Sequence, residues 1–129
     1  MPIVKVHRRA GRPSAENRQV LDAIHASLIE AFKIPVADRN QILFAHEAAA
    51  FEIAAGRTDA FTLIEITAFP GRSLEAKRKL YQALATRCEA AGVGPADLFV
   101  VLTEPPLENW SPRDGVSSVD AKPSFKLDV

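Results

Sequence analysis

Two stretches of this chain repeat one another, and this repetition constrains the fold more than any other feature of the sequence. The sequence GRPS at 11–14 returns as GRS at 71–73, sixty positions later. The sequence PVAD at 35–38 returns as GPAD at 94–97, ending fifty-nine positions later, so a one-residue gap relates the two halves. Because such spacing is typical of a duplicated supersecondary unit, the sequence predicts one motif that occurs twice.

Each half is predicted to be a strand, a helix and a second strand. Segments rich in Ile, Val, Leu and Phe predict the strands Ile3–His7, Asn40–Ala45, Phe61–Thr67 and Leu98–Thr103. Apolar residues that recur every three or four positions predict helices over about Ala15–Lys33, with Ser14 as N-cap, and Leu74–Ala91, with Ser73 as N-cap. Crossovers of this kind make the two strands of each half parallel. The expected fold is therefore an α/β (α+β) tandem β-α-β repeat, with a four-stranded sheet and two helices on one face.

The length of 129 residues fits one domain. We expect the domain to occupy residues 1–115, with halves at about 1–58 and 59–104, and residues 116–129 to form a C-terminal arm. The connector Glu47–Asp59 fits two structures equally well, because its alanines permit a helical turn and its Phe and Ile residues permit a short strand.

Several predicted strands are apolar at successive positions, as in Ile42-Leu43-Phe44, whereas a strand with one solvated face would alternate. Two helices can cover only one face of a four-stranded sheet. The other face must therefore contact something else, and the simplest partner is another copy of the chain. The pattern alone thus predicts self-association.

Composition excludes several classes of function. Sixteen Lys and Arg balance sixteen Asp and Glu, and this zero net charge argues against nucleic-acid binding. No apolar run approaches the roughly 18 residues that span a bilayer, and the N-terminus does not read as a targeting segment. The single cysteine, Cys88, forms no internal disulfide, so we expect a reducing, cytoplasmic environment.

Pro2 and Arg72 are the residues whose positions favour catalysis. If the initiator methionine is removed, Pro2 has a free secondary amine, and α-amino groups titrate near about 8. Apolar surroundings or a nearby cation favour the neutral amine, which can then be a general base or a nucleophile. Arg72 lies between a predicted strand and helix, where it can bind a carboxylate. Each residue alone also has an ordinary interpretation. Many chains begin with Met-Pro, and an arginine in a tight turn is often simply solvated.

Other polar residues fit structural roles better. The three histidines lack the spacing of metal ligands, and Cys88 lies on the apolar stripe of the second helix. The run His7-Arg8-Arg9, with Arg12, is interpreted as a solvated strand end. Asp38 has two interpretations, since its repeat counterpart Asp97 shows that an aspartate here can simply stabilise a turn.

Met-Pro followed by apolar residues, the β-α-β repeat and Pro70-Gly71-Arg72-Ser73 together resemble the tautomerase superfamily. Three further features resemble its malonate semialdehyde decarboxylase-like branch: AFKIPVADR at 31–39, His46, and Glu104 followed by ENWS at 108–111. The resemblance covers residues 2 to about 115.

The resemblance implies a homotrimer that needs no cofactor and acts on a small oxo acid. Pro2 would be the catalytic amine, Arg72 would bind the substrate carboxylate and polarise its carbonyl, and Asp38 would assist Pro2. The substrate would further contact Phe69, Trp110 and Arg39.

Keto–enol tautomerisation is the reaction that this set of residues favours. Two alternatives stay open: decarboxylation or hydration, as in malonate semialdehyde decarboxylase, and a catalytically inactive trimeric binding module. The sequence departs from the decarboxylase pattern at one point. Phe69 or Pro70 stands where that branch has a second arginine before the second helix, which weighs against decarboxylation.

Overall fold

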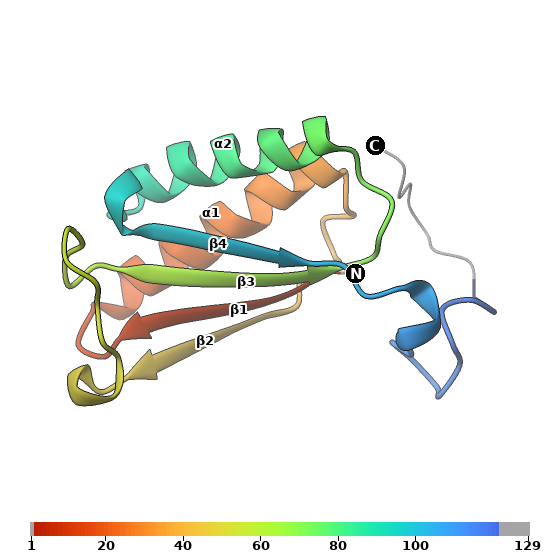
Figure 1. The fold of residues 1–129 in the computed structure, drawn as a ribbon, viewed down its shortest axis with the longest axis horizontal. Helices are drawn as coiled ribbons and strands as arrows, with labels where there is room; N and C mark the ends of the chain where they lie inside the picture. Colours follow the sequence, from red (N-terminus) through yellow and green to blue (C-terminus); the bar gives the residue numbers. More distant parts are fainter. Residues whose placement is uncertain (1, 122–129) are drawn as a thin grey trace.

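The computed structural model describes residues 2–121, and it confirms the predicted tandem β-α-β fold (Figure 1). Met1 and residues 122–129, which include most of the predicted arm, lie outside the described residues. The strands are β1 Pro2–Arg9, β2 Gln41–His46, β3 Thr62–Ala68 and β4 Leu98–Thr103. The helices are α1 Ser14–Phe32 and α2 Leu74–Ala90, and both cover the same face of the sheet.

The strand order is β2-β1-β3-β4, with parallel pairs inside each half and an antiparallel pair, β1 and β3, between the halves. Pro2 lies opposite Ala68 in this register. One end of the sheet, which we call the Pro2 end, therefore contains the start of β1 and the carboxyl ends of β3 and β4. The opposite end, which we call the Thr62 end, contains the end of β1 and the start of β3.

The hydrophobic core lies between the sheet and the two helices. Alternate side chains of the central strands point into it, because successive residues of a strand face opposite sides. The core includes Val4, Val6, Ile64 and Ile66 from the sheet, Ile24 and Leu28 from α1, and Leu80, Leu84 and Cys88 from α2. Each large apolar side chain buried here contributes about 1.5–3 kcal/mol. Burial also raises the pKa of the Cys88 thiol to about 11, as expected for a packing residue.

The two helices begin differently. Ser73 caps α2 as predicted, since its Oγ accepts a hydrogen bond from the backbone N–H of Ala76 at 3.1 Å. The prediction that Ser14 caps α1 is wrong, because Pro13 occupies the cap position and Ser14 is already the first helical residue. Proline carries no capping side chain, and the first turn of α1 is instead bound to the sheet through Glu16.

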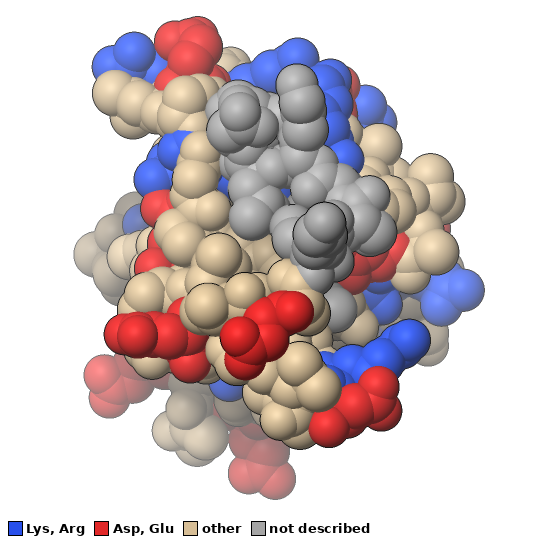
Figure 2. Space-filling model, turned by 90° about the vertical axis from the view of Figure 1, so that its right-hand side faces the viewer, with Lys and Arg blue, Asp and Glu red and all other residues tan. Residues whose placement is uncertain are grey.

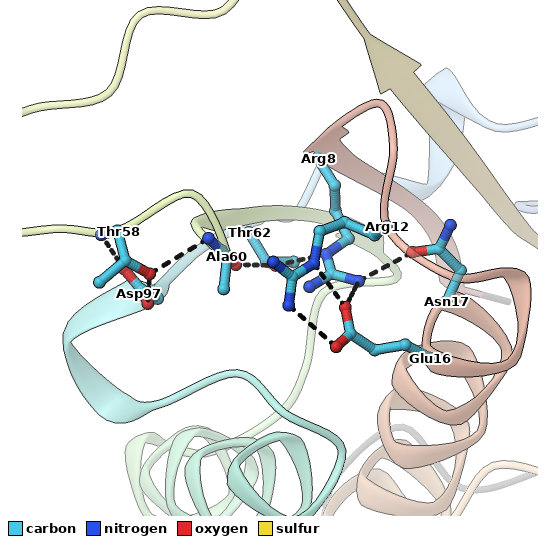
Figure 3. Close-up of polar contacts among 8 residues, drawn as sticks. All are labelled: Arg8, Arg12, Glu16, Asn17, Thr58, Ala60, Thr62 and Asp97. Atoms are coloured by element: carbon cyan, nitrogen blue, oxygen red, sulfur yellow. Dashed lines mark hydrogen bonds and ion pairs between the residues drawn. The ribbon is translucent and has the colours of Figure 1, made fainter. Parts of the chain in front are cut away.

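The prediction of a solvated basic strand end is wrong for Arg8, whose side chain is 1% exposed. Arg8 continues the inward alternation of β1, so its side chain falls on the helix-covered face. There it donates to Thr62 Oγ1 at 2.9 Å and to Asn17 Oδ1 at 2.8 Å, and its Nη1 lies 2.9 Å from Glu16 Oε2 (Figure 3). The guanidinium therefore joins β1, β3 and α1 at the Thr62 end.

The face of the sheet without helices is partly apolar, as the sequence predicted. Its exposed hydrophobic residues are Ile3, Ile42, Phe99 and Val101. A hydrogen-bonded chain crosses three strands on this face. His7 Nδ1 lies 2.9 Å from His46 Nε2, and His7 Nε2 lies 2.7 Å from Glu65 Oε2. The ring of Phe44 stacks on His7 with centroids 4.8 Å apart.

The connector and the segment after β4 are short turns. Residues Ala48–Ala50 form a 3₁₀ turn, so of the two predicted structures the connector adopts the helical one. After β4, a 3₁₀ turn at Leu107–Asn109 leads to the buried Trp110, whose carbonyl accepts a bond from Ser118 N–H at 2.9 Å. No helix within residues 2–121 has the length and apolarity needed to cross a bilayer.

Candidate active site

Pro2 is buried as the first residue of β1, at the end of the sheet where the N-terminus is marked in Figure 1. Its neighbour in the ladder is Ala68, so the loop that follows β3 begins beside it. Asn40 fixes the other side. The backbone carbonyl of Asn40 accepts from Val4 N–H at 2.9 Å, and its side-chain Nδ2 lies 3.5 Å from the carbonyl oxygen of Pro2. The start of the chain is thus attached to a rigid strand.

Asp38 lies in the tight turn that precedes β2, the strand next to β1. Its backbone N–H donates to Pro35 O at 3.0 Å, which closes the turn. The Nδ2 of Asn40 donates to Asp38 Oδ1 at 3.0 Å. Asn40 therefore bridges the Asp38 carboxylate and the backbone of Pro2.

Arg72 lies in the loop between β3 and α2, directly after Gly71, whose φ of 122° only glycine adopts readily. The Arg72 side chain is buried at 6% exposure. Its Nη1 donates to Phe69 O at 3.1 Å, and its guanidinium carbon lies 4.8 Å from the ring centroid of Phe32.

The charge of Arg72 is balanced by two carboxylates. Burial lowers the pKa of Arg72 from its ordinary value, and the negative charges of Glu104 and then Asp38 oppose that shift. Glu104 follows β4 directly. Its Oε1 lies 2.5 Å from Nζ of Lys77, which comes from the first turns of α2. The side chains of Lys77 and Glu104 are 25% and 21% exposed, so this ion pair is largely screened from solvent.

Two aromatic side chains close the Pro2 end. The rings of Phe69 and Trp110 meet edge to face, with centroids 4.8 Å apart, and both residues are buried. The indole Nε1 of Trp110 donates to Pro105 O at 3.1 Å, which fixes the ring. Figure 2 looks onto this end of the molecule and shows both acidic and basic side chains there.

The structure brings five of the six predicted site residues to one end of the sheet: Pro2, Asp38, Arg72, Phe69 and Trp110. Arg39 follows Asp38 in the chain, but its side chain is engaged by α1, where its Nη2 donates to Asp22 Oδ1 at 2.6 Å. The sequence analysis assigned no role to Asn40, Lys77 or Glu104. Glu104 belongs to a motif that carries the family resemblance and Lys77 lies close to another, and that was the only available signal for them.

Two further features bear on where a site could lie. An open groove on the outer side of the helices is lined by exposed basic residues such as Lys33, Arg78 and Lys79. None of the six predicted site residues lines it. Within residues 2–121, no three His, Cys, Asp or Glu side chains gather as a metal-binding group. The Pro2 end therefore combines a buried guanidinium, two buried aromatic side chains and the first residue of β1.

Comparisons with known proteins all point to one family. A family model described as tautomerase enzyme matches residues 38–113. The chain is 31% identical over 121 residues to the probable tautomerase YusQ of Bacillus subtilis, covering 89% of this chain and 95% of that one. It is also 31% identical over 117 residues to the probable tautomerase YrdN of the same organism, covering 86% and 90%.

Solved structures agree with the sequence comparison. The FG41 malonate semialdehyde decarboxylase inhibited by 3-bromopropiolate superposes with a TM-score of 0.85 at 27% identity, covering 96% of this chain and 99% of that one. Another malonate semialdehyde decarboxylase superposes at 0.81 with 30% identity, covering 88% and 92%. A fused 4-OT wild-type symmetric trimer superposes at 0.81 with 28% identity, covering 92% and 98%.

Proposed function

The chain belongs to the tautomerase family, and from that premise we propose that it catalyses keto–enol tautomerisation of a small oxo acid with the amine of Pro2. The observation that carries the proposal is the position of Pro2. It begins a buried strand at the same sheet end as the buried guanidinium of Arg72. Burial and a cation at the same end of the sheet both favour the neutral form of an amine.

In the proposed reaction, the neutral amine of Pro2 takes a proton from the carbon next to the carbonyl and returns it at another atom. Arg72 binds the carboxylate and stabilises the negative charge that develops on the carbonyl oxygen. Its burial supports this role, because charge interactions strengthen where water is excluded. Asp38 assists Pro2, with its carboxylate held by Asn40, and Phe69 and Trp110 form the apolar wall.

The proposed enzyme is a homotrimer located in the cytoplasm, with residues 1–115 as its single domain. A trimer is supported by the exposed apolar residues of the open sheet face and by the trimeric 4-OT structure at 28% identity. A cytoplasmic location is supported by the buried, unpaired thiol of Cys88. Sedimentation of the purified protein tests the assembly, and a stable monomer at micromolar concentration would contradict it.

Decarboxylation or hydration of a 3-oxo acid is the second candidate, favoured by the two malonate semialdehyde decarboxylase structures at 27% and 30% identity. That chemistry calls for a protonated Pro2 amine, whereas tautomerisation calls for a neutral one. NMR titration of a ¹⁵N-labelled Pro2 separates the two reactions. An amine that is neutral at pH 7 supports tautomerisation, and one that is protonated at pH 7 supports the decarboxylase.

The proposal is tested by blocking the amine. The untagged protein is expected to lack the mass of one methionine and to accelerate ketonisation of a 2-oxo acid enol. The same protein with an uncleaved N-terminal tag has an amide at Pro2 and is expected to lose about 10²–10⁴ of that acceleration. A C-terminal tag serves as control and leaves the rate unchanged. Equal rates for both tagged proteins would rule out the Pro2 amine, and a protein with a free Pro2 and no activity favours a binding module.

A further inference from the structure

We propose that Arg57 of one copy binds Glu47 of the neighbouring copy in the trimer, and that this ion pair fixes which sheet edges meet. The inference rests on the trimer of the proposed function and deepens it, because it names two side chains that join neighbouring copies. Its basis is an arginine that packs against two aromatic rings and pairs with no carboxylate of its own copy.

The guanidinium of Arg57 lies against the rings of Phe61 and Phe99. Its central carbon is 4.7 Å from the ring centroid of Phe61 and 5.2 Å from that of Phe99. Its Nη1 is buried without a hydrogen-bond partner, which is uncommon for a polar atom in a folded protein. In the part of the chain that the structure describes, no carboxylate pairs with this side chain. The two rings attract the cation and keep water from it, so a carboxylate that reaches it binds more strongly.

The carboxylates beside Arg57 are bound elsewhere. Asp59 is only two residues away, yet its Oδ1 accepts from Arg9 Nη1 at 2.6 Å. Asp97 accepts from the backbone N–H and the hydroxyl of Thr58. A carboxylate for Arg57 therefore has to come from outside its own copy.

Arg57 and Glu47 lie at the same end of the sheet but at opposite edges. Arg57 contacts Phe99 near the start of the edge strand β4, whereas Glu47 directly follows the other edge strand, β2. The connector between them crosses the Thr62 end of the sheet (Figure 1). The side chain of Glu47 is exposed and does not cap the 3₁₀ turn that follows it. Within the described residues, no cation pairs with it.

A closed ring of identical copies joins one edge of each copy to the other edge of its neighbour. Three copies placed around an axis that runs along the strands have their Thr62 ends together, so Arg57 of one copy meets Glu47 of the next. The exposed side chains of Phe99 and Val101 on β4 and of Ile42 on β2 supply apolar area for the same contact. The symmetric trimer of a fused 4-OT at 28% identity supports such a ring.

Charge reversal tests the ion pair. Arg57→Glu and Glu47→Arg are each expected to raise the concentration at which the trimer dissociates about 100-fold, because like charges then meet at every contact. Combining both substitutions restores opposite charges and is expected to return this concentration to within about 10-fold of the unsubstituted protein. Sedimentation equilibrium measures it. Arg78→Glu on α2 and Glu52→Arg in the connector make the same charge changes at exposed positions and are expected to have no effect.

Cross-linking tests proximity directly. A protein with Arg57→Cys and Glu47→Cys is expected to form covalent dimers and trimers with a short bismaleimide, since the two positions lie at opposite edges of one copy. Arg78→Cys with Glu47→Cys is the control and is expected to form none, because the native Cys88 is buried.

Arg57→Glu also removes the contact with Phe61, so Glu47→Arg and the cross-link decide the outcome if that variant fails to fold. A Glu47→Arg protein that dissociates like the unsubstituted one, a folded double variant that does not recover, or absent cross-links would overturn the inference. Neither measurement needs turnover, so a trimer without tautomerase activity contradicts the proposed reaction and still tests the ion pair. An unsubstituted protein that is a monomer would overturn both the trimer and the ion pair.

Discussion

The Pro2 end and the Thr62 end of the sheet are built from the same repeated unit, yet their charged residues are used differently. At the Thr62 end, Arg12 pairs with Glu16, and Asp97 accepts bonds from the backbone N–H and the hydroxyl of Thr58 (Figure 3). At the Pro2 end, the counterpart Arg72 donates to Phe69 O, and the counterpart Asp38 accepts from Asn40. The repeated unit thus has one end where polar side chains join β1, β3 and α1, and another end where their counterparts lie at the candidate site.

One residue explains much of this difference. Pro13 has no counterpart in the second half, so α1 begins at Ser14 whereas α2 begins after Ser73. Glu16 is consequently the third residue of its helix, and its counterpart Glu75 is the second. Because successive helical residues are about 100° apart, Glu75 points away. Its side chain is 86% exposed and lies 3.7 Å from Arg78. The second half therefore lacks a helical carboxylate on its loop arginine.

The largest expected effect is on stability at the Thr62 end. Arg8→Met leaves Glu16, Asn17 and Thr62 without their shared buried donor, and we expect the free energy of unfolding to fall by about 3 kcal/mol. Urea unfolding monitored by circular dichroism measures the change, with the exposed Arg113→Met as control. A loss of unfolding free energy below about 1 kcal/mol would contradict the comparison, because the polar groups of the Thr62 end would then contribute little to stability.

Asp97 and Asp38 hold equivalent positions in the two halves, so substituting each one tests the two ends separately. Asp97→Asn replaces a buried carboxylate that accepts two hydrogen bonds, and we expect it to cost about 2 kcal/mol of unfolding free energy. Asp38→Asn keeps an acceptor for Asn40 and is expected to cost less than about 0.5 kcal/mol while lowering kcat/KM. Stability curves and enol kinetics on both variants check this. The reversed outcome, with activity lost in Asp97→Asn and stability lost in Asp38→Asn, contradicts the assignment of the two ends.

The smallest effect concerns acid stability. The hydrogen bond from Arg12, with a further one from Arg8, holds the pKa of Glu16 below its ordinary value. The stability that this carboxylate contributes is therefore complete above its unfolded-state pKa, about 4.3, and is lost as the pH falls through the folded-state pKa. Between pH 5 and 3 we expect the protein to lose about 1 kcal/mol more than Glu16→Gln does. Parallel losses in urea unfolding across that range would refute the prediction.

The sequence was sufficient for the framework of the fold. Apolar periodicity located every strand and both long helices, and the repeat gave the two parallel crossovers. Arg8 could not be predicted to be buried, because a basic residue in a basic run resembles a solvated one and its partner Thr62 is 54 residues away. The contact of Arg39 was equally unpredictable, since its partner Asp22 lies on another element. Pro2 and Arg72 were found through motifs, whereas the contact between Lys77 and Glu104 exists only in the folded chain.

The histidine chain on the open face has a consequence for where hydrogen atoms lie. The gap of 2.9 Å between His7 Nδ1 and His46 Nε2 has room for one hydrogen. A carboxylate only accepts, so the hydrogen on His7 Nε2 is directed to Glu65, and the hydrogen between the rings belongs to His46. Donation in one direction, from His46 to His7 and from His7 to Glu65, therefore joins β2, β1 and β3 on the sheet face that other copies of the chain are expected to cover.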